Sequence, residues 1–145
     1  MFYYTIVMKK AIVIVVAILA LSWILIGCSH DSPSKPKEMR AGAIFFSNES
    51  PNSLILSRYV QTHDGHTSSR EVNRSVYIHT RYQLTNIFDG TRSFPGGDRV
   101  TVYFYSPSHN PYDPTPEYSG DVAFTVDGQT IVKVLGRDMY ELSGN

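Results

Sequence analysis

The feature that most constrains the fold of this chain is an alternation of apolar and polar side chains that recurs between residues 42 and 142. It is clearest where Val100, Val102 and Phe104 alternate with Thr101 and Tyr103. Side chains of a half-buried strand alternate between two faces in this way, whereas a helix repeats its apolar stripe about every 3.6 residues. No helical stripe is found in this region, so the sequence predicts an all-β domain with little or no helix.

Seven stretches rich in β-branched and aromatic residues are predicted strands, separated by turn-forming residues. They cover residues 42–47, 53–60, 75–87, 99–105, 120–126, 130–135 and 139–142. This number and spacing favour an antiparallel β-sandwich of about seven strands, immunoglobulin-like or transthyretin-like. Asp127-Gly128 is expected to close a type I′ hairpin, because both central positions of that turn need a positive φ. The polar stretch 61–74 is expected to be a solvated loop.

A different pattern occupies the first 28 residues. Lys9-Lys10 precede an apolar run over residues 11–26, in which Ser22 is the one polar residue. The run is slightly shorter than the about 20 residues of a membrane-spanning helix. Gly27 and Cys28 follow it, and Cys28 is the only cysteine of the chain. A basic start, a short apolar helix and a small residue before the cleavage point are typical of an export signal.

The tetrapeptide Leu25-Ile26-Gly27-Cys28 resembles the lipobox of bacterial lipoproteins. The resemblance implies a chain that is exported, cut before Cys28 and held on a membrane by lipid attached to that cysteine. In that family aspartate after the cysteine retains the protein in the inner membrane. Ser29 at this position therefore implies the outer membrane. We expect the domain on the periplasmic face of that membrane, with the cell surface as the alternative. An uncleaved membrane anchor is the alternative, and Met8 is a more usual start for such a signal than Met1.

These patterns divide the chain into a signal peptide at 1–28, a tether at 29–40 and one domain at 41–145. The tether is polar and contains two prolines, which favours a flexible, partly extended linker. The domain has no cysteine of its own and therefore no disulfide. A chain of about 100 residues buries roughly two-thirds of its unfolded surface, which is enough for one domain.

The charge of the mature chain argues against one class of partner. The sequence has 13 Lys and Arg and 13 Asp and Glu, and the signal peptide removes two lysines, which leaves 11 basic against 13 acidic residues. Positive and negative residues are interspersed, whereas nucleic-acid binding needs a concentrated basic surface. We therefore expect a membrane and an envelope or secreted protein as partners, and no nucleic acid.

The tightest group of possible metal ligands is His63-Asp64-Gly65-His66. Two imidazoles and a carboxylate could begin a zinc or copper site, but zinc needs three or four protein ligands. No further ligand has a fixed relation to this group, so a solvated loop is the simpler interpretation and no cofactor is expected. A small-ligand or metal-binding lipoprotein that uses His63 and His66 is the alternative function.

Motifs of hydrolases are missing from the sequence. It has no Gly-x-Ser-x-Gly elbow and no His-Glu-x-x-His, and its one cysteine belongs to the signal. A Ser-His-Asp triad assembled from distant positions stays open, because its members need not be neighbours in sequence. We expect a protein that is not an enzyme, with a hydrolase as the least favoured alternative.

The most unusual segment of the domain is 106–119, which holds four of the eight prolines of the chain. Prolines stiffen a loop and so reduce the entropy that it loses on binding. The candidate contact residues of this loop are His109, Tyr112, Asp113 and Tyr118, because amphipathic rings are enriched at contact surfaces. Alternatively, the loop covers one end of the sandwich and its tyrosines pack against the core.

A second candidate surface combines the outward faces of two predicted strands. One face would present Tyr77, His79 and Arg81, and the other Tyr103 and Tyr105. If those strands pair, they form a flat Tyr/Arg patch that suits a protein or a glycan. The sequence thus predicts a membrane-anchored, non-catalytic binding or structural accessory module of the cell envelope. It would serve in a secretion or envelope complex, or as an inhibitor or immunity protein.

Overall fold

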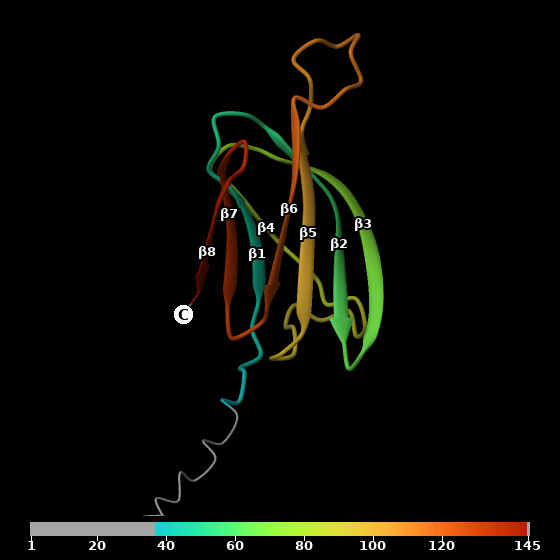
Figure 1. Ribbon diagram of the computed structural model, residues 1–145, viewed down its shortest axis with the longest axis vertical. Helices are drawn as coiled ribbons and strands as arrows, with labels where there is room; N and C mark the ends of the chain where they lie inside the picture. The colour runs from blue at the N-terminus through green and yellow to red at the C-terminus, as the bar shows by residue number, and fades with distance from the viewer. Residues whose placement is uncertain (1–36, 145) are drawn as a thin grey trace, which may run out of the picture. The chain divides into compact units, whose positions relative to one another are not determined.

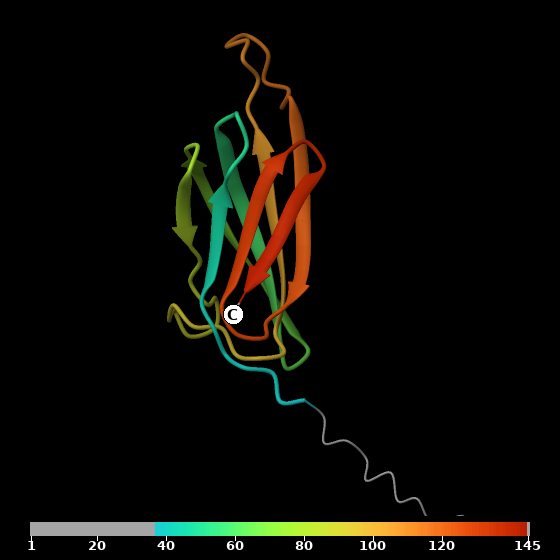
Figure 2. The ribbon, with the colours of Figure 1, turned by 90° about the vertical axis from the view of Figure 1, so that its left-hand side faces the viewer.

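The computed structural model describes residues 37–144, and Glu38–Asn145 forms one compact unit. The predicted signal helix, the lipidation residue Cys28 and most of the tether lie outside the described residues. Within the described part of the chain, no helix has the length and apolarity needed to cross a bilayer. Two sheets of four strands face each other, as Figures 1 and 2 show, so the predicted all-β sandwich is confirmed.

The strands are eight rather than seven, and each sheet holds four of them. The first sheet has the order β4 (Thr80–Gln83), β1 (Ile44–Asn48), β7 (Thr130–Gly136) and β8 (Met139–Gly144). The second sheet has the order β3 (His66–Val76), β2 (Leu54–His63), β5 (Arg99–Ser106) and β6 (Tyr118–Thr125). The eighth strand is β3, most of which lies in the stretch 61–74 that the sequence predicts to be a loop.

The core lies between the sheets and follows the alternation seen in the sequence. Val100, Val102 and Phe104 are buried, while the residues between them face outward. Across the two layers, the rings of Phe46 and Phe104 lie 5.5 Å apart in a tilted arrangement. Burial of such side chains is the main source of stability in a domain without a disulfide.

One pair of strands departs from the predicted antiparallel arrangement. β1 pairs antiparallel with β4 but parallel with β7, from Ile44 opposite Thr130 to Asn48 opposite Val134. Parallel neighbours need a long connection, and here the whole second sheet separates β1 from β7 in the sequence. The direction of β1 relative to β7 depends on this long connection, and the local alternation of side chains does not reveal it.

The predicted hairpin at Asp127-Gly128 is wrong. β6 and β7 belong to different sheets, so this turn carries the chain from one layer to the other. Gly128 has φ of +89°, but Asp127 is not among the residues with positive φ, as a type I′ turn would require. The turn instead packs on the incoming chain: the Gly128 N–H donates to the Arg40 carbonyl at 2.7 Å. Another Asp-Gly pair of this chain does form a hairpin of the expected type.

That pair is Asp64-Gly65, which joins β2 and β3 in a tight hairpin. Both residues have positive φ, +46° and +77°, as in a type I′ turn. The prediction of a solvated loop at 61–74 is therefore wrong, since this stretch ends β2 and forms most of β3. Its residues are polar because β3 is an edge strand with most side chains exposed.

The predicted strand 75–87 is also wrong as a single element. It breaks after Val76, at the end of β3, and resumes at Thr80 in the other sheet. His79 takes the left-handed conformation with φ of +58°, and the Thr80 N–H donates back to the Tyr77 carbonyl at 3.1 Å. A left-handed residue turns the chain sharply, so the apparent alternation through this point belongs to two strands.

The two ends of the sandwich carry different features. In Figure 1 the described chain enters at the lower end, while the connection between β5 and β6 projects from the upper end. Asp127 lies near the lower end, where its Oδ1 accepts a hydrogen bond from the Arg40 N–H at 3.1 Å. The projecting connection is the proline-rich segment singled out in the sequence.

Candidate binding surface at the loop end

The connection between β5 and β6, residues 107–117, is shaped by its own short-range hydrogen bonds. Asn110 accepts bonds from the Asp113 N–H at its carbonyl, 3.0 Å, and from the Tyr112 N–H at its side chain, 3.1 Å. Asp113 in turn accepts one from the Thr115 N–H at 2.9 Å. The backbone hydrogen bond from Thr115 holds the pKa of the Asp113 carboxyl below its usual value. These turns and four prolines give the loop a defined shape.

Glu117 stabilises the base of this loop through four contacts. Its carboxylate pairs with the imidazole of His109 and accepts a bond from the Asn52 side-chain amide at 3.5 Å. Its backbone carbonyl accepts a bond from the Arg137 guanidinium, and its N–H donates to the Ser106 carbonyl at 3.0 Å. The predicted contact residue His109 therefore has a structural partner within the loop.

The two tyrosines of the loop region have opposite environments. Tyr112, in the projecting part, is 92% exposed. Tyr118, at the start of β6, is half-buried and packs against the core, and the Arg137 guanidinium lies 5.9 Å from its ring. The alternative in which both tyrosines cover the core thus applies to Tyr118, while Tyr112 presents its whole ring to solvent.

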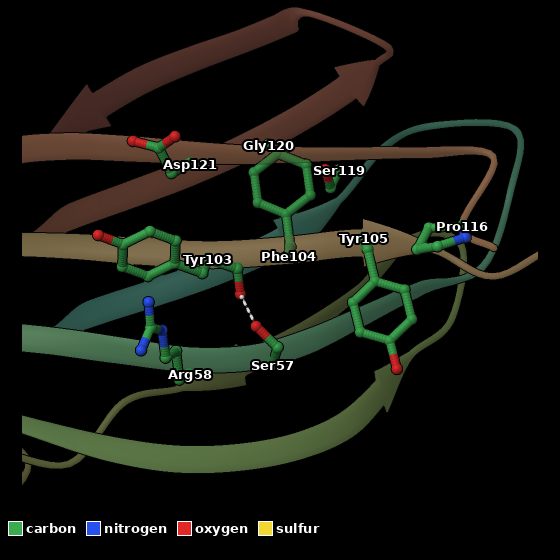
Figure 3. A pocket seen from close by; sticks show the side chains of 9 residues that line it. All are labelled: Ser57, Arg58, Tyr103, Phe104, Tyr105, Pro116, Ser119, Gly120 and Asp121. Carbon is green, nitrogen blue, oxygen red and sulfur yellow. Dashed lines mark hydrogen bonds between the residues drawn. The ribbon is translucent and has the colours of Figure 1, made fainter. Parts of the chain in front are cut away.

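Beside the base of the loop, the outer face of the second sheet contains a hollow of about 350 Å³. It lies over β2, β5 and β6, as Figure 3 shows. Its lining residues are Ser57, Arg58, Tyr103, Phe104, Tyr105, Pro116, Ser119, Gly120 and Asp121. The hollow thus brings together the two tyrosines that the sequence proposed on β5 and a proline from the loop.

A β-bulge in β2 positions Arg58, the cationic side chain of this hollow. Leu56 lies opposite Phe104, but Arg58 lies opposite Tyr103, so β2 holds one residue more than β5 at this point. The extra residue, Ser57, donates from its hydroxyl to the Tyr103 carbonyl at 3.1 Å. The Arg58 guanidinium carbon then lies 4.5 Å from the centre of the Tyr103 ring, in a cation–π contact.

The sequence contained a signal for this bulge that strict alternation misses. Leu54 and Leu56 are buried two residues apart, but the next buried residues of β2 are Tyr59 and Gln61. A step of three residues in an otherwise two-residue pattern is what an inserted residue produces. It would have placed Arg58 on the outer face of β2, whereas its position opposite Tyr103 depends on the register with β5.

On β6, a glycine faces the aromatic ring that closes the inner side of the hollow. Gly120 lies opposite Phe104, and a Cβ atom at position 120 would lie only 2.9 Å from the Cζ of that ring. The Phe104 ring covers the glycine in Figure 3. Asp121, the next residue, is exposed on the outer face and is opposite Tyr103.

The predicted patch that joins Tyr77, His79 and Arg81 to the β5 tyrosines does not form. Arg81 lies on β4 in the first sheet, whereas Tyr103 and Tyr105 lie on β5 in the second. The patch required the predicted strand with Tyr77, His79 and Arg81 to pair with β5. The left-handed turn at His79 instead directs the chain into the first sheet. Tyr77 is 66% exposed, but it stands apart from the hollow.

At the opposite end of the sandwich, His63 and His66 face each other across the β2–β3 hairpin. The His63 Nδ1 is bonded to the Asp98 carboxylate at 2.7 Å, and this hydrogen bond raises the pKa of His63. His66 is exposed. Residues 37–144 contain no cluster of three or more histidine, cysteine, aspartate or glutamate side chains suited to a metal ion.

No protein-family model and no curated protein matches this chain. Among solved structures it is similar to one described as a trapped toxin, with 15% identity and a TM-score of 0.46. A disulfide-locked mutant of intermedilysin with human CD59 gives 14% and 0.45, and listeriolysin O gives 13% and 0.43. Each match covers 74% of this chain but only 22–24% of the other, so this chain spans about a quarter of those proteins.

Proposed function

We propose that this chain is a lipid-anchored, non-catalytic binding module of the bacterial cell envelope that contacts a protein partner through its β5–β6 loop. The observation that carries the proposal is a self-braced, proline-rich loop that presents Tyr112 at 92% exposure. A stiff loop loses little entropy on binding, and a tyrosine contributes a large amphipathic ring to a contact.

The position of the loop supports this function. The described chain begins at one end of the sandwich and the loop projects from the other (Figure 1). A lipid on Cys28 would anchor the chain through the residues that precede the domain. Those residues join the domain at the end where the described chain begins, and the loop projects from the other end. Anchoring also concentrates a binder at the membrane, so its intrinsic affinity need not be high.

The histidines support a non-catalytic role. Three histidines in the described part of the chain hydrogen-bond to a carboxylate, in the pairs His63–Asp98, His79–Glu49 and His109–Glu117. In none of the three does a serine hydroxyl hydrogen-bond to the imidazole, as a nucleophile of the serine-hydrolase type would. His109 and Glu117 instead act as a brace for the loop.

Partner capture from the native membrane tests the proposal. The lipidated chain would be purified from detergent-solubilised envelope as wild type, as Tyr112→Ala and as Tyr77→Ala, a control tyrosine that is also exposed. We expect one envelope or secreted protein to copurify with wild type and Tyr77→Ala, and its recovery to fall about tenfold with Tyr112→Ala, as for a residue central to an interface. Equal recovery with all three chains would contradict the proposal.

A further inference from the structure

A cationic, an aromatic and an anionic side chain form a row across the outer face of the second sheet. The register places Arg58 of β2 opposite Tyr103 of β5, and Tyr103 opposite Asp121 of β6. Arg58 and Asp121 are exposed, and Tyr103 between them is half-buried. The hollow therefore has a cation on one side, an anion on the other and an aromatic ring between them.

This arrangement selects against ligands with a net charge. Of the nine residues that line the hollow, only Arg58 and Asp121 are charged, and their signs are opposite. An anion would be attracted by the first and repelled by the second, and a cation the reverse. A neutral hydroxyl group avoids this conflict, because it can accept a bond from a guanidinium and donate one to a carboxylate.

The two charged residues of the hollow stand on opposite sides of β5. Arg58 and Asp121 stand on strands separated by β5, so their backbones lie about 10 Å apart. A ligand of one or two sugar rings has hydroxyl groups at its rim that span such a separation.

The other end of the hollow supplies apolar surface. Figure 3 shows the Tyr105 ring and Pro116 on the side next to the loop, away from Asp121. The C–H face of a sugar ring packs on surfaces of this kind, as apolar groups in a binding site generally do. Ser57 and Ser119 add hydroxyl groups along the margin.

From this chemistry we propose that the hollow binds a neutral saccharide of one to three rings. Its hydroxyl groups bond to Arg58 and Asp121 while a C–H face packs on Tyr105 and Pro116. This site is separate from the protein contact proposed for Tyr112 and would add a glycan ligand to the same end of the domain.

Calorimetric titration of the full chain in a detergent without sugar groups tests the site. The probes are the neutral trisaccharides maltotriose, cellotriose and N,N′,N″-triacetylchitotriose, with the anionic trigalacturonate and free glycine for comparison. We expect saturable binding of at least one neutral trisaccharide, and no tighter binding of trigalacturonate or glycine. Asp121→Asn and Tyr105→Ala should each weaken that binding about tenfold, since each removes one of the contacts that the site offers.

Two variants serve as controls. Arg99→Ala removes an exposed arginine from the outer face of β5 outside the hollow, and Tyr112→Ala removes the ring proposed for the protein contact. Both should leave the saccharide affinity within about twofold of wild type. The site is overturned if no neutral trisaccharide binds while the chain still melts cooperatively, if trigalacturonate binds more tightly, or if Arg99→Ala weakens binding as much as Asp121→Asn. If wild type captures no partner, or if Tyr112→Ala captures it as well as wild type does, while saccharide binding is intact, the proposed function alone is overturned.

Discussion

Among single residues, Asp98 shows how this small core accommodates a buried charge. It is 4% exposed, and its carboxylate accepts a bond from the Gln61 side-chain amide at 2.6 Å and contacts the His63 Nδ1 at 2.7 Å. Gln61 is itself buried and accepts a bond from the Ile87 N–H at 2.8 Å. A buried polar group is costly unless it is bonded, and here each one has a partner. The cluster therefore joins the end of β2 to the segment before β5.

This cluster predicts a pH dependence of stability. The hydrogen bond to Asp98 raises the pKa of His63 above the ordinary 6.5, and the nearby carboxylates of Asp64 and Asp89 act in the same direction. A raised pKa in the folded state stabilises the protein fully below pH 6.5, and this contribution is lost as the pH rises through the folded-state pKa. The melting temperature of wild type should thus exceed that of His63→Gln most at low pH, and the difference should shrink above pH 6.5.

Thermal melts of both chains over this range provide the measurement. His66→Gln is the matched control, because His66 is exposed on the same hairpin. If the melting temperatures of wild type and His63→Gln differ by the same amount at every pH, the charge of His63 does not contribute to stability.

Asn48 at the end of β1 is the second residue on which a prediction can be made. It is fully buried, and its amide donates to the carbonyls of Asn52, at 2.9 Å, and Val76, at 2.8 Å. Its side-chain oxygen accepts bonds from the N–H and the hydroxyl of Ser50, at 3.0 and 2.7 Å. Asn48→Ala removes these four hydrogen bonds from a buried site and should lower the free energy of unfolding by about 3 kcal/mol.

Urea denaturation measures this loss. Asn110→Ala, in the exposed loop, should change the free energy of unfolding by less than about 1 kcal/mol. Similar losses for the two asparagines would mean that the bonds of Asn48 do not stabilise the fold.

Among the elements, the β2–β3 hairpin is the one whose geometry depends most on a single residue. Gly65 has φ of +77°, and a Cβ atom at this position would have no other atom within 4 Å. Any effect of Gly65→Ala must therefore come from the backbone, since a side chain at positive φ costs about 1 kcal/mol. We expect this loss in urea denaturation, with Ser69→Ala on exposed β3 close to neutral. A neutral Gly65→Ala would contradict the turn conformation.

The elements also show how far the sequence predicts the fold. The strands β5, β6 and β7 were predicted almost as found, because one face of each is buried and the alternation is regular. β3 was missed because an exposed edge strand has no apolar face to alternate. Pairing between distant strands, such as parallel β1 and β7, depends on contacts that no local pattern records.

The candidate surface was predicted in the same partial way. The proline content identified the loop of Tyr112, and the alternation placed Tyr103 and Tyr105 on an outer face. Arg58 and Asp121 were missed, since they join Tyr103 only through the bulge in β2 and the register of β6. Both are properties of strand pairing, which becomes visible only when the strands are assembled.

For the whole molecule, a lipid anchor at Cys28, as the sequence predicts, would determine where the domain acts. Metabolic labelling with an alkyne analogue of palmitate should mark the wild-type chain and not Cys28→Ser, because no other thiol is present. The described domain contains no cysteine, so its melting temperature should be the same in both chains. Label that persists in Cys28→Ser would contradict lipidation at this residue.

The central claim is that the molecule meets its partner through the β5–β6 loop that carries Tyr112. Site-specific photocrosslinking in intact cells tests it most directly, with the crosslinking amino acid at position 112 in one chain and at position 77 in another. Both native tyrosines are exposed, at 92% and 66%. The account predicts one discrete protein adduct from position 112 and none from position 77. Adducts from position 77 alone, or from neither position, would contradict it.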